Sequence, residues 1–348
     1  MISASELSDD QRRQLVDARQ VFEAWQSADA VRHRRYRGSM RWLTRKGRDY
    51  LHRKLGTRER SLGARTVETE RAWDAFHDGR ARNRLELARL SARLDDMAPV
   101  NRALGLGRIP RLTARIMRGL DKQRLLGQHL LLVGTNALFC YESAAGVFFQ
   151  GGLLATGDAD LLWDARQRLA LVLPEARSQG VLGVLQRTDR SFQTRGPRDF
   201  RAFNGDGFWV DLIRPEDKRF LASTARDTLG EREDDLHGSP IRGLQWLVSA
   251  PRFERVAVGA DGYPVRLVTV DPRAFALHKL WLSQQAGRDP VKRQRDVAQA
   301  VAVAALCRTH LALPFESEAL RALPLSLRRL LLDGEQGPVE QGPVEPHW

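Results

Sequence analysis

Helical periodicity dominates the first third of the chain, with one strand-like segment inside it. Residues 8–35 carry apolar side chains at the spacing of a single helix face, and Ser8 can cap that helix. From residue 37 to 55, apolar and basic positions alternate on both sides of a Lys46–Gly47 turn, which predicts a β-hairpin. Helical spacing resumes at Ser61. We therefore expect residues 1–120 to form a basic region of helices and a β-hairpin.

The pattern changes after about Gln128, where short apolar segments alternate with turns that contain glycine. HLLLVG, at residues 129–134, predicts a buried strand that ends in glycine and leads into a helix. Two further strands are predicted around GDADLL and WVDLI, at residues 157–162 and 209–213. This order of elements is typical of an α+β fold, so residues 121–270 are expected to form a small mixed β-sheet core with helices.

The last part of the chain returns to helical spacing. PRAFALHKLWLSQ and VKRQRDVAQAVAVAALCRTHL predict two helices, so a helical C-terminal region is expected over residues 271–334. Residues 335–348 repeat a unit rich in proline and glycine, which predicts a flexible tail.

The net charge of the chain indicates which class of binding partner to expect. Its 348 residues include 56 Lys and Arg but 43 Asp and Glu, a formal net charge of +13. This excess favours a polyanion, with RNA or DNA ahead of a membrane surface, although basic composition alone is the open alternative.

The two cysteines cannot form a disulfide framework, the first residues are polar, and no apolar run approaches the roughly 20 residues of a membrane span. We expect a cytoplasmic protein without a membrane partner.

Two aspartates in one predicted strand are the first candidates for chemistry. Asp158 and Asp160 are separated by one residue, so both side chains leave the same face of the sheet. Asp211 is a third carboxylate inside an apolar strand, where leaving it unpaired would be costly. Carboxylates that meet repel one another unless a cation lies between them, and oxygen ligands suit Mg²⁺ or Mn²⁺. The alternative, that Asp158 and Asp160 are solvated positions at a strand end, stays open.

A turn upstream of these aspartates can bind phosphate. LLLVGTNAL runs from a buried strand through Gly134 into a helix, and Thr135 adds a hydroxyl group. Glycine lets a ligand approach the backbone closely, and a helix N-terminus presents free N–H groups to phosphate. An ordinary strand-to-helix turn has the same pattern, so the position just before the aspartates is what makes these two residues candidates.

Several common catalytic motifs are absent. The sequence contains no GxxxxGK[ST] loop, no HExxH pair and no GxSxG turn. GLGRIP, which starts at Gly105, lacks the third glycine of a dinucleotide-binding loop. A P-loop, an HExxH zinc site and a GxSxG nucleophile turn are therefore excluded as interpretations.

In the order VGT, GDADLL and VDLI, the three segments resemble the signatures of the DNA polymerase β-type nucleotidyltransferase superfamily. That pattern is an apolar-Gly-Gly/Ser turn, an Asp-x-Asp strand and a third acidic residue on a later strand. Thr135 stands where Ser is usual, and the hydroxyl group is kept. The flanking sequence, from YRGSMRW to DPRAFALHKLWLS, is similar to a bacterial nucleotidyltransferase-domain branch that resembles AbiEii-type toxins in style.

The resemblance implies a metal-dependent enzyme with a nucleoside triphosphate as substrate. Asp158, Asp160 and Asp211 would be catalytic residues and ligands of Mg²⁺ or Mn²⁺, and Gly134 and Thr135 would bind the nucleotide. The cations expected on the triphosphate are Lys279, Arg288 and Lys292. An exposed basic helix face is the alternative for them. AbiEii-type enzymes often add an acidic pair near here, but this chain has Asp296 followed by Gln299, which puts a further acidic role in doubt.

The predicted hairpin is the candidate RNA-binding element. Arg41, Arg45 and Arg48 can follow a phosphate backbone, while an aromatic side chain such as Trp42 can stack on an unpaired base. The alternative is a solvated hairpin that its aromatic residues dock on the rest of the protein. Both interpretations stay open.

Together these features predict transfer of a nucleoside monophosphate to an acceptor hydroxyl, with an RNA 3′ end such as that of tRNA as the expected acceptor. The toxin-like resemblance adds an antitoxin as an expected partner. Two alternatives remain: nucleotidylation of a protein side chain, and a nucleic-acid-binding protein whose transferase site is inactive. RNA binding separates the first alternative from the main hypothesis, and intact aspartates argue against the second.

Overall fold

The computed structural model describes residues 4–164, 174–216 and 228–330, and the predicted tail at 335–348 lies outside them. The chain divides into two compact units. The helical unit consists of Asp9–Gly107 with Asp261–Pro264, and the rest of the chain forms the core unit. None of the helices in the described ranges combines the length and hydrophobicity that crossing a membrane requires.

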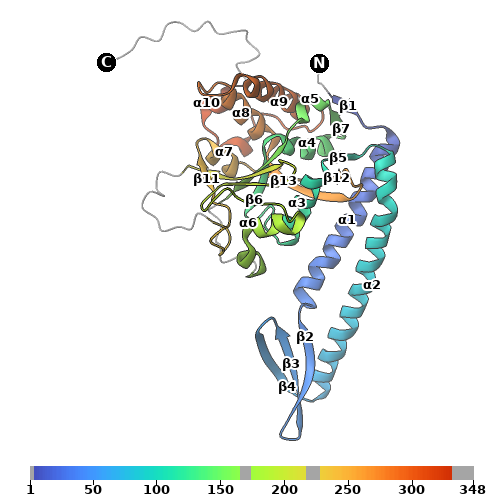
Figure 1. The fold of residues 1–348 in the computed structure, drawn as a ribbon. Coiled ribbons are helices and arrows are strands. Elements are labelled where there is room, and N and C mark those ends of the chain that lie inside the picture. Colours follow the sequence, from blue (N-terminus) through green and yellow to red (C-terminus); the bar gives the residue numbers. More distant parts are fainter. Residues whose placement is uncertain (1–3, 165–173, 217–227, 331–348) are drawn as a thin grey trace, which may run out of the picture. The chain divides into compact units, whose positions relative to one another are not determined.

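Two long antiparallel helices make up most of the helical unit (Figure 1). Their bounds are Asp9–Arg35 for α1 and Val67–Ala103 for α2. Gln14 near the start of α1 donates a hydrogen bond to Asn101 near the end of α2 at 2.9 Å, and Asn83 donates to the carbonyl oxygen of Ala28 at 2.9 Å. The buried residues of α1 include Val21 and Phe22, which belong to the predicted apolar face.

A three-stranded antiparallel sheet connects these two helices. It contains β2 (Ser39–Arg45), β3 (Arg48–Leu55) and β4 (Arg58–Ala64), in that order. The predicted hairpin is present as β2 and β3, and β4 extends it. The expectation that helical structure resumes at Ser61 was wrong. Helix α2 begins at Val67 because the Thr66 and Thr69 side chains form a capping box there, which satisfies free N–H groups at the helix start.

The main sheet of the core unit is mixed. Its strand order is β11-β10-β8-β6, with β9 paired to β10. Strand β10 is parallel to both β8 and β11, whereas β6 and β9 are antiparallel to their neighbours. The bounds are β6 (Leu130–Val133), β8 (Asp158–Trp163), β9 (Arg201–Phe203), β10 (Trp209–Pro215) and β11 (Ser239–Ile241). Leu161 and Leu162 are consecutive and both fully buried, so both faces of β8 are covered.

Helices surround this sheet (Figure 1), which confirms the predicted α+β fold. They are α3 (Arg111–Lys122), α4 (Leu138–Ala145), α5 (Gly151–Leu154), α6 (Pro174–Thr188), α7 (Leu244–Ser249), α8 (Pro272–Ser283), α9 (Pro290–Thr309) and α10 (Leu325–Arg329), with single 3₁₀ turns at Gly134–Ala137 and Glu318–Leu320. Two smaller sheets complete the fold. They contain β1 (Ala4–Glu6) with β7 (Val147–Phe149), and β5 (Gly107–Ile109) with β12 (Arg252–Gly259) and β13 (Pro264–Val270).

The helices α8 and α9 begin with the same local signal. In each, an aspartate caps the helix, Asp271 for α8 and Asp289 for α9, and a proline occupies the first helical position. Proline fits there because its missing N–H would have no partner inside the helix. Helix α8 is buried along almost its whole length, which places its few polar side chains inside the core unit.

Candidate active site

The pairing of β8 with β10 brings three aspartates together. The two strands are parallel, and their register places Asp160 directly beside Asp211. Asp158 lies two residues before Asp160 on the same strand, so its side chain leaves the same face. The structure therefore gathers the three carboxylates that the sequence singled out on one face of the sheet.

Asp160 is the aspartate whose pKa is raised in this arrangement. Burial and the neighbouring charges of Asp158 and Asp211 raise its pKa to about 7, although the nearby cations Lys279 and Arg201 oppose the rise. A carboxylate in this setting either keeps its proton near neutral pH or needs an additional positive charge. The site can therefore accommodate a cation on electrostatic grounds.

Asp211 is already held by an arginine. It is 6% exposed, and both its oxygens accept hydrogen bonds from Arg201, from Nε and from Nη2, each at 2.6 Å. Arg201 lies on β9, directly opposite Asp211 in the antiparallel register. Its guanidinium also lies over the ring of Trp209, 4.3 Å from the centroid. Arg201 is thus the partner that a carboxylate in an apolar strand requires, and its own pKa is raised by the hydrogen bonds to Asp211.

Gly134 allows the close approach of the turn to Asp160. Its backbone has φ +67°, and a β-carbon at this position would collide with a carboxylate oxygen of Asp160. Only glycine meets both conditions, because other residues rarely adopt this backbone conformation and all of them add a β-carbon. The predicted phosphate-binding turn therefore lies directly against the central aspartate.

The residues that follow Gly134 are fixed by hydrogen bonds. Thr135 is buried, and its hydroxyl accepts a hydrogen bond from Nε2 of Gln299 at 3.1 Å. Asn136 donates from its amide nitrogen to the carbonyl oxygen of Asp158 at 2.7 Å, which ties the turn to β8. The hydroxyl of Thr156 donates to the Asp158 carboxylate. Gln299, which stands in the position of the missing acid, therefore supports the turn.

Lys279 and Arg288 converge on Asp296. Lys279 is 7% exposed and Asp296 is 0% exposed, and the Lys279 Nζ donates to Oδ1 of Asp296 at 2.7 Å. Arg288 donates from Nε to the other oxygen, Oδ2, at 2.7 Å. Burial lowers the pKa of Lys279, while Asp296 and Asp160 act against that shift. Asp296, whose role the sequence left in doubt, is thus the buried counter-ion of two predicted phosphate-binding cations.

Lys292 is placed differently from these two cations. Its side chain is exposed in the first turn of α9, and its backbone N–H donates to the Asp289 cap at 3.0 Å. One turn further on, Arg295 donates to the carbonyl oxygen of Ala155 at 3.2 Å, just before β8. Arg295, another cation of this basic segment, therefore contacts the residues just before the strand that carries Asp158 and Asp160.

The carboxylates do not form a complete metal cage as they stand. In the described part of the chain, no three His, Cys, Asp or Glu side chains come together in a group that could hold a metal ion. The two Asp211 oxygens are directed at Arg201. Asp158 and Asp160 nevertheless present hard oxygen donors, and burial together with the neighbouring carboxylates raises the pKa of Asp160. This donor set fits a divalent cation of the Mg²⁺ type.

The candidate RNA-binding residues lie on two faces of the small sheet. Because side chains alternate along a strand, Arg41 and Arg45 of β2 share one face, and the β2–β3 register puts Arg48 on the same face. Trp42 lies on the opposite face, where the guanidinium of Arg65 is 5.1 Å from its ring centroid. The basic residues and the aromatic residue of the predicted set therefore do not form a single surface.

A family model described as Nucleotidyltransferase matches residues 111–324. The matched region includes the Gly134 turn, the three aspartates, and the pair formed by Lys279 and Asp296. Comparisons with curated proteins and with solved structures give no match. Because the matched region covers more than half of the 348 residues, the chain belongs to this nucleotidyltransferase family and is a nucleotidyl-transferring enzyme.

Proposed function

We propose that this nucleotidyltransferase transfers a nucleoside monophosphate from a nucleoside triphosphate to an RNA hydroxyl, with the 3′ end of a tRNA-like molecule as acceptor. The observation that carries the proposal is the shared face of Asp158, Asp160 and Asp211 beside the Gly134 turn. Adjacent carboxylates next to a phosphate-binding turn suit displacement at phosphorus, where catalysis consists mainly of positioning and charge stabilisation.

The three aspartates have different roles in the proposed reaction. Asp158 and Asp160 would hold a divalent cation, Mg²⁺ or Mn²⁺, which would neutralise charge on the triphosphate when bound. The acceptor oxygen forms a bond to the α-phosphorus, the bond to the bridging oxygen breaks, and pyrophosphate leaves. Asp211 takes the proton of the acceptor hydroxyl. This requires one Asp211 oxygen to leave Arg201, so the arginine holds the base in its resting position.

The triphosphate is bound by backbone and side-chain donors around the aspartates. The turn at Gly134 and Thr135 faces the phosphates, and Lys279 contributes its ammonium group. That group has three N–H donors, of which Asp296 accepts one. Arg288, just before α9, and Lys292 and Arg295, near the start of α9, add positive charge. Asp296 limits how far Lys279 can move and so fixes where its remaining donors point.

RNA is the acceptor that the charge of the protein favours. A net charge of +13 supports binding of a polyanion. Arg41, Arg45 and Arg48 lie on one face of the small sheet, where Arg41 pairs with Glu59, and Trp42 lies on the other face. The similarity to AbiEii-type toxins adds a toxin-like role, controlled by an antitoxin, to this proposal. Nucleotidylation of a protein side chain is the second candidate, since it uses the same aspartates.

The test is a transfer assay with each of the four nucleoside triphosphates, labelled at the α-phosphate. The full-length protein is incubated with Mn²⁺ and either purified total RNA or RNase-treated cell lysate. Label in RNA from one nucleotide supports the proposal. Label in protein alone selects the second candidate, and no label in either sample contradicts both.

The pH dependence of protein stability tests whether the pKa of Asp160 is raised. The native state binds the Asp160 proton more tightly than the unfolded chain, because the pKa rises from 3.8 to about 7. The Asp160 carboxyl therefore makes its full contribution to the free energy of unfolding below about pH 4, and this contribution is lost as the pH rises through about 7. In metal-free protein at pH 8, we expect Asp160→Asn to raise the free energy of unfolding by about 2–4 kcal/mol.

Urea denaturation in the presence of a chelator measures this effect. The advantage of the Asn variant should shrink at pH 5, where wild-type Asp160 is protonated. A difference between the two proteins that does not change from pH 5 to pH 8 would contradict the raised pKa.

A further inference from the structure

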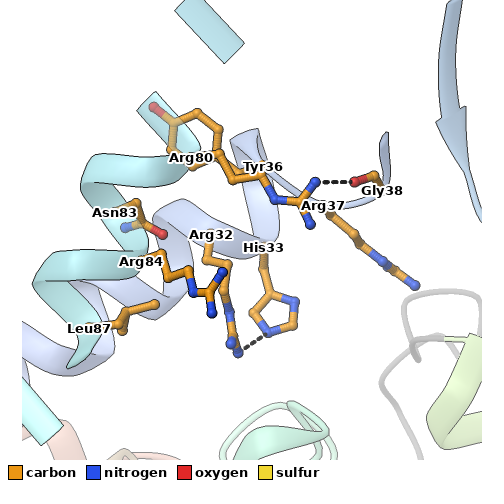
Figure 2. Close-up of a pocket in the computed structure, with 9 residues that line it drawn as sticks. All are labelled: Arg32, His33, Tyr36, Arg37, Gly38, Arg80, Asn83, Arg84 and Leu87. Atoms are coloured by element: carbon orange, nitrogen blue, oxygen red, sulfur yellow. Dashed lines mark hydrogen bonds between the residues drawn. The ribbon is translucent and has the colours of Figure 1, made fainter. Parts of the chain in front are cut away.

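A basic pocket lies within the helical unit, where the last turns of α1 face the middle of α2. It has a volume of about 490 Å³. Figure 2 shows the side chains that line it, which come from both helices and from the segment that leads into β2. Pockets of this volume accommodate small organic ligands or one part of a larger one.

Positive charge is concentrated around this pocket. Four arginines, Arg32, Arg37, Arg80 and Arg84, are among its lining residues, and no carboxylate is. Arg32 and Arg84 belong to different helices, and Figure 2 shows them extending to the same side. Guanidinium groups brought together repel one another, so an arrangement of this kind favours an anion between them.

Structural roles account for only part of this charge. Arg32 lies in the last turn of α1, where basic residues compensate the helix dipole, and it pairs with Asp29 at 2.5 Å. Arg80 donates through Nη1 to the carbonyl oxygen of Gly38 at 3.0 Å, which leaves four of its five N–H donors. Arg84 makes no hydrogen bond or ion pair with any residue that the structure describes. Neither Arg80 nor Arg84 is near a helix end.

Tyr36 supplies an aromatic side chain at one end of the pocket, and Leu87 lies at the other end. The position of Tyr36 depends on Gly79 of α2, because a β-carbon at Gly79 would collide with the Tyr36 hydroxyl. Glycine in the middle of a helix lowers the stability of that helix. At Gly79 the missing side chain lets the Tyr36 ring lie against the backbone of α2. An aromatic ring next to several guanidinium groups suits a ligand that has both a flat base and phosphate groups.

We propose that this pocket binds single-stranded RNA, with a phosphate between Arg80 and Arg84 and the adjoining base against Tyr36. The choice of RNA over free polyphosphate rests on the RNA acceptor of the proposed function, while the anion preference rests on the pocket itself. Single-stranded RNA is favoured over a duplex because only an unpaired base can reach an aromatic side chain.

The experiment measures binding of a fluorescent 12-nucleotide single-stranded RNA to the full-length protein, by anisotropy over a range of salt concentrations. The pocket variant is the double change Arg80→Gln and Arg84→Gln. Its matched control is Arg82→Gln with Arg93→Gln, which removes two exposed arginines from the same helix outside the pocket. A third protein, with Arg41, Arg45 and Arg48 changed to Ser, tests the sheet face. Tripolyphosphate and a poly-glutamate peptide serve as competitors.

We expect the pocket variant to bind RNA about tenfold more weakly than wild type. Its log–log salt slope should be shallower by about 0.7 for each phosphate that the protein no longer neutralises. The control should stay within about twofold. Equal losses of affinity in the pocket variant and the control would overturn the proposal, because binding would then follow net charge alone. Unchanged binding by the pocket variant, or stronger displacement of RNA by poly-glutamate than by tripolyphosphate, would also overturn it.

Two further measurements separate this proposal from the proposed function. Asp160→Asn should bind the RNA as wild type does, since the aspartate belongs to the core unit. The pocket variant should keep wild-type affinity for nucleoside triphosphate. If wild type transfers label to RNA while the pocket variant binds RNA normally, the pocket proposal fails and the function stands. If the pocket variant loses RNA binding while wild type transfers label only to protein, the function fails and the pocket stands.

Discussion

Replacing Asp160 with Asn is expected to lower the rate of nucleotidyl transfer by roughly a thousandfold, the size of effect seen when a preorganised charge-stabilising group is removed. Asp160 is the central member of the carboxylate group, between Asp158 on its own strand and Asp211 on the next. The amide that replaces it cannot carry the negative charge that retains a divalent cation. Single-turnover transfer of an α-phosphate label, with saturating nucleotide and Mn²⁺, measures the decrease.

The control for this change is Asp206→Asn. Asp206 is exposed in the loop before β10, in the same unit as the aspartates, and it is not part of the gathered carboxylates. It should retain the wild-type rate within about twofold, as is usual for surface substitutions. Calorimetric titration with Mn²⁺ and a nonhydrolysable nucleotide should show binding by wild type and by the control, but not by Asp160→Asn. Transfer by Asp160→Asn at a rate close to wild type would remove this carboxylate from the catalytic site.

Asp296→Asn is expected to lower the free energy of unfolding by about 3–5 kcal/mol, the cost of leaving a buried charge without its partner. Asp296 is 0% exposed and binds both Lys279 and Arg288. Without its charge, the Lys279 ammonium loses the carboxylate that accepts its hydrogen bond, and of the two carboxylates that oppose its loss of solvation Asp160 is left. Chemical denaturation at pH 7, followed by tryptophan fluorescence, measures the change.

An exposed ion pair provides the comparison. Glu318 pairs with Arg321 at 3.3 Å, and both side chains are largely exposed. Glu318→Gln should leave stability nearly unchanged, since solvent screens such pairs. If Asp296→Asn does not fold, Lys279→Met is the second variant, and its stability should decrease less because Arg288 still accompanies Asp296. Equal stability of wild type and both Asp296→Asn and Lys279→Met would show that this pair contributes nothing to the core.

Local periodicity explains why the sequence placed the three aspartates on strands that the structure pairs. The two-residue repeat of a strand put Asp158 and Asp160 on one face, and the apolar residues around Asp211 marked a second strand. The same repeat separates Arg41 from Trp42, because neighbouring residues in a strand point to opposite faces. Arg41 and Trp42 therefore lie on opposite faces of the small sheet, as the strand repeat indicates.

The residues that pair with Asp211 and Lys279 could not be identified from the sequence, because these pairs form only in the tertiary structure. Arg201 precedes Asp211 by ten residues, and only the antiparallel register of β9 with β10 sets them opposite each other. Asp296 follows Lys279 by seventeen residues, across the connection between two helices. The cost of burying Asp211 and Lys279 did require some opposite charge near each. Several arginines and aspartates in the chain met that requirement equally well, so the sequence could not select among them.

Gly134 has a consequence for how mutations at this site would be interpreted. The volume that a methyl group would occupy at this position is filled by an oxygen of Asp160. In a library screened for loss of function, replacements at Gly134 should therefore be recovered about as often as replacements of the aspartates, although glycine carries no reactive group. A survey that looks only for chemically active side chains would overlook this position, because its role is to leave room for the Asp160 carboxylate.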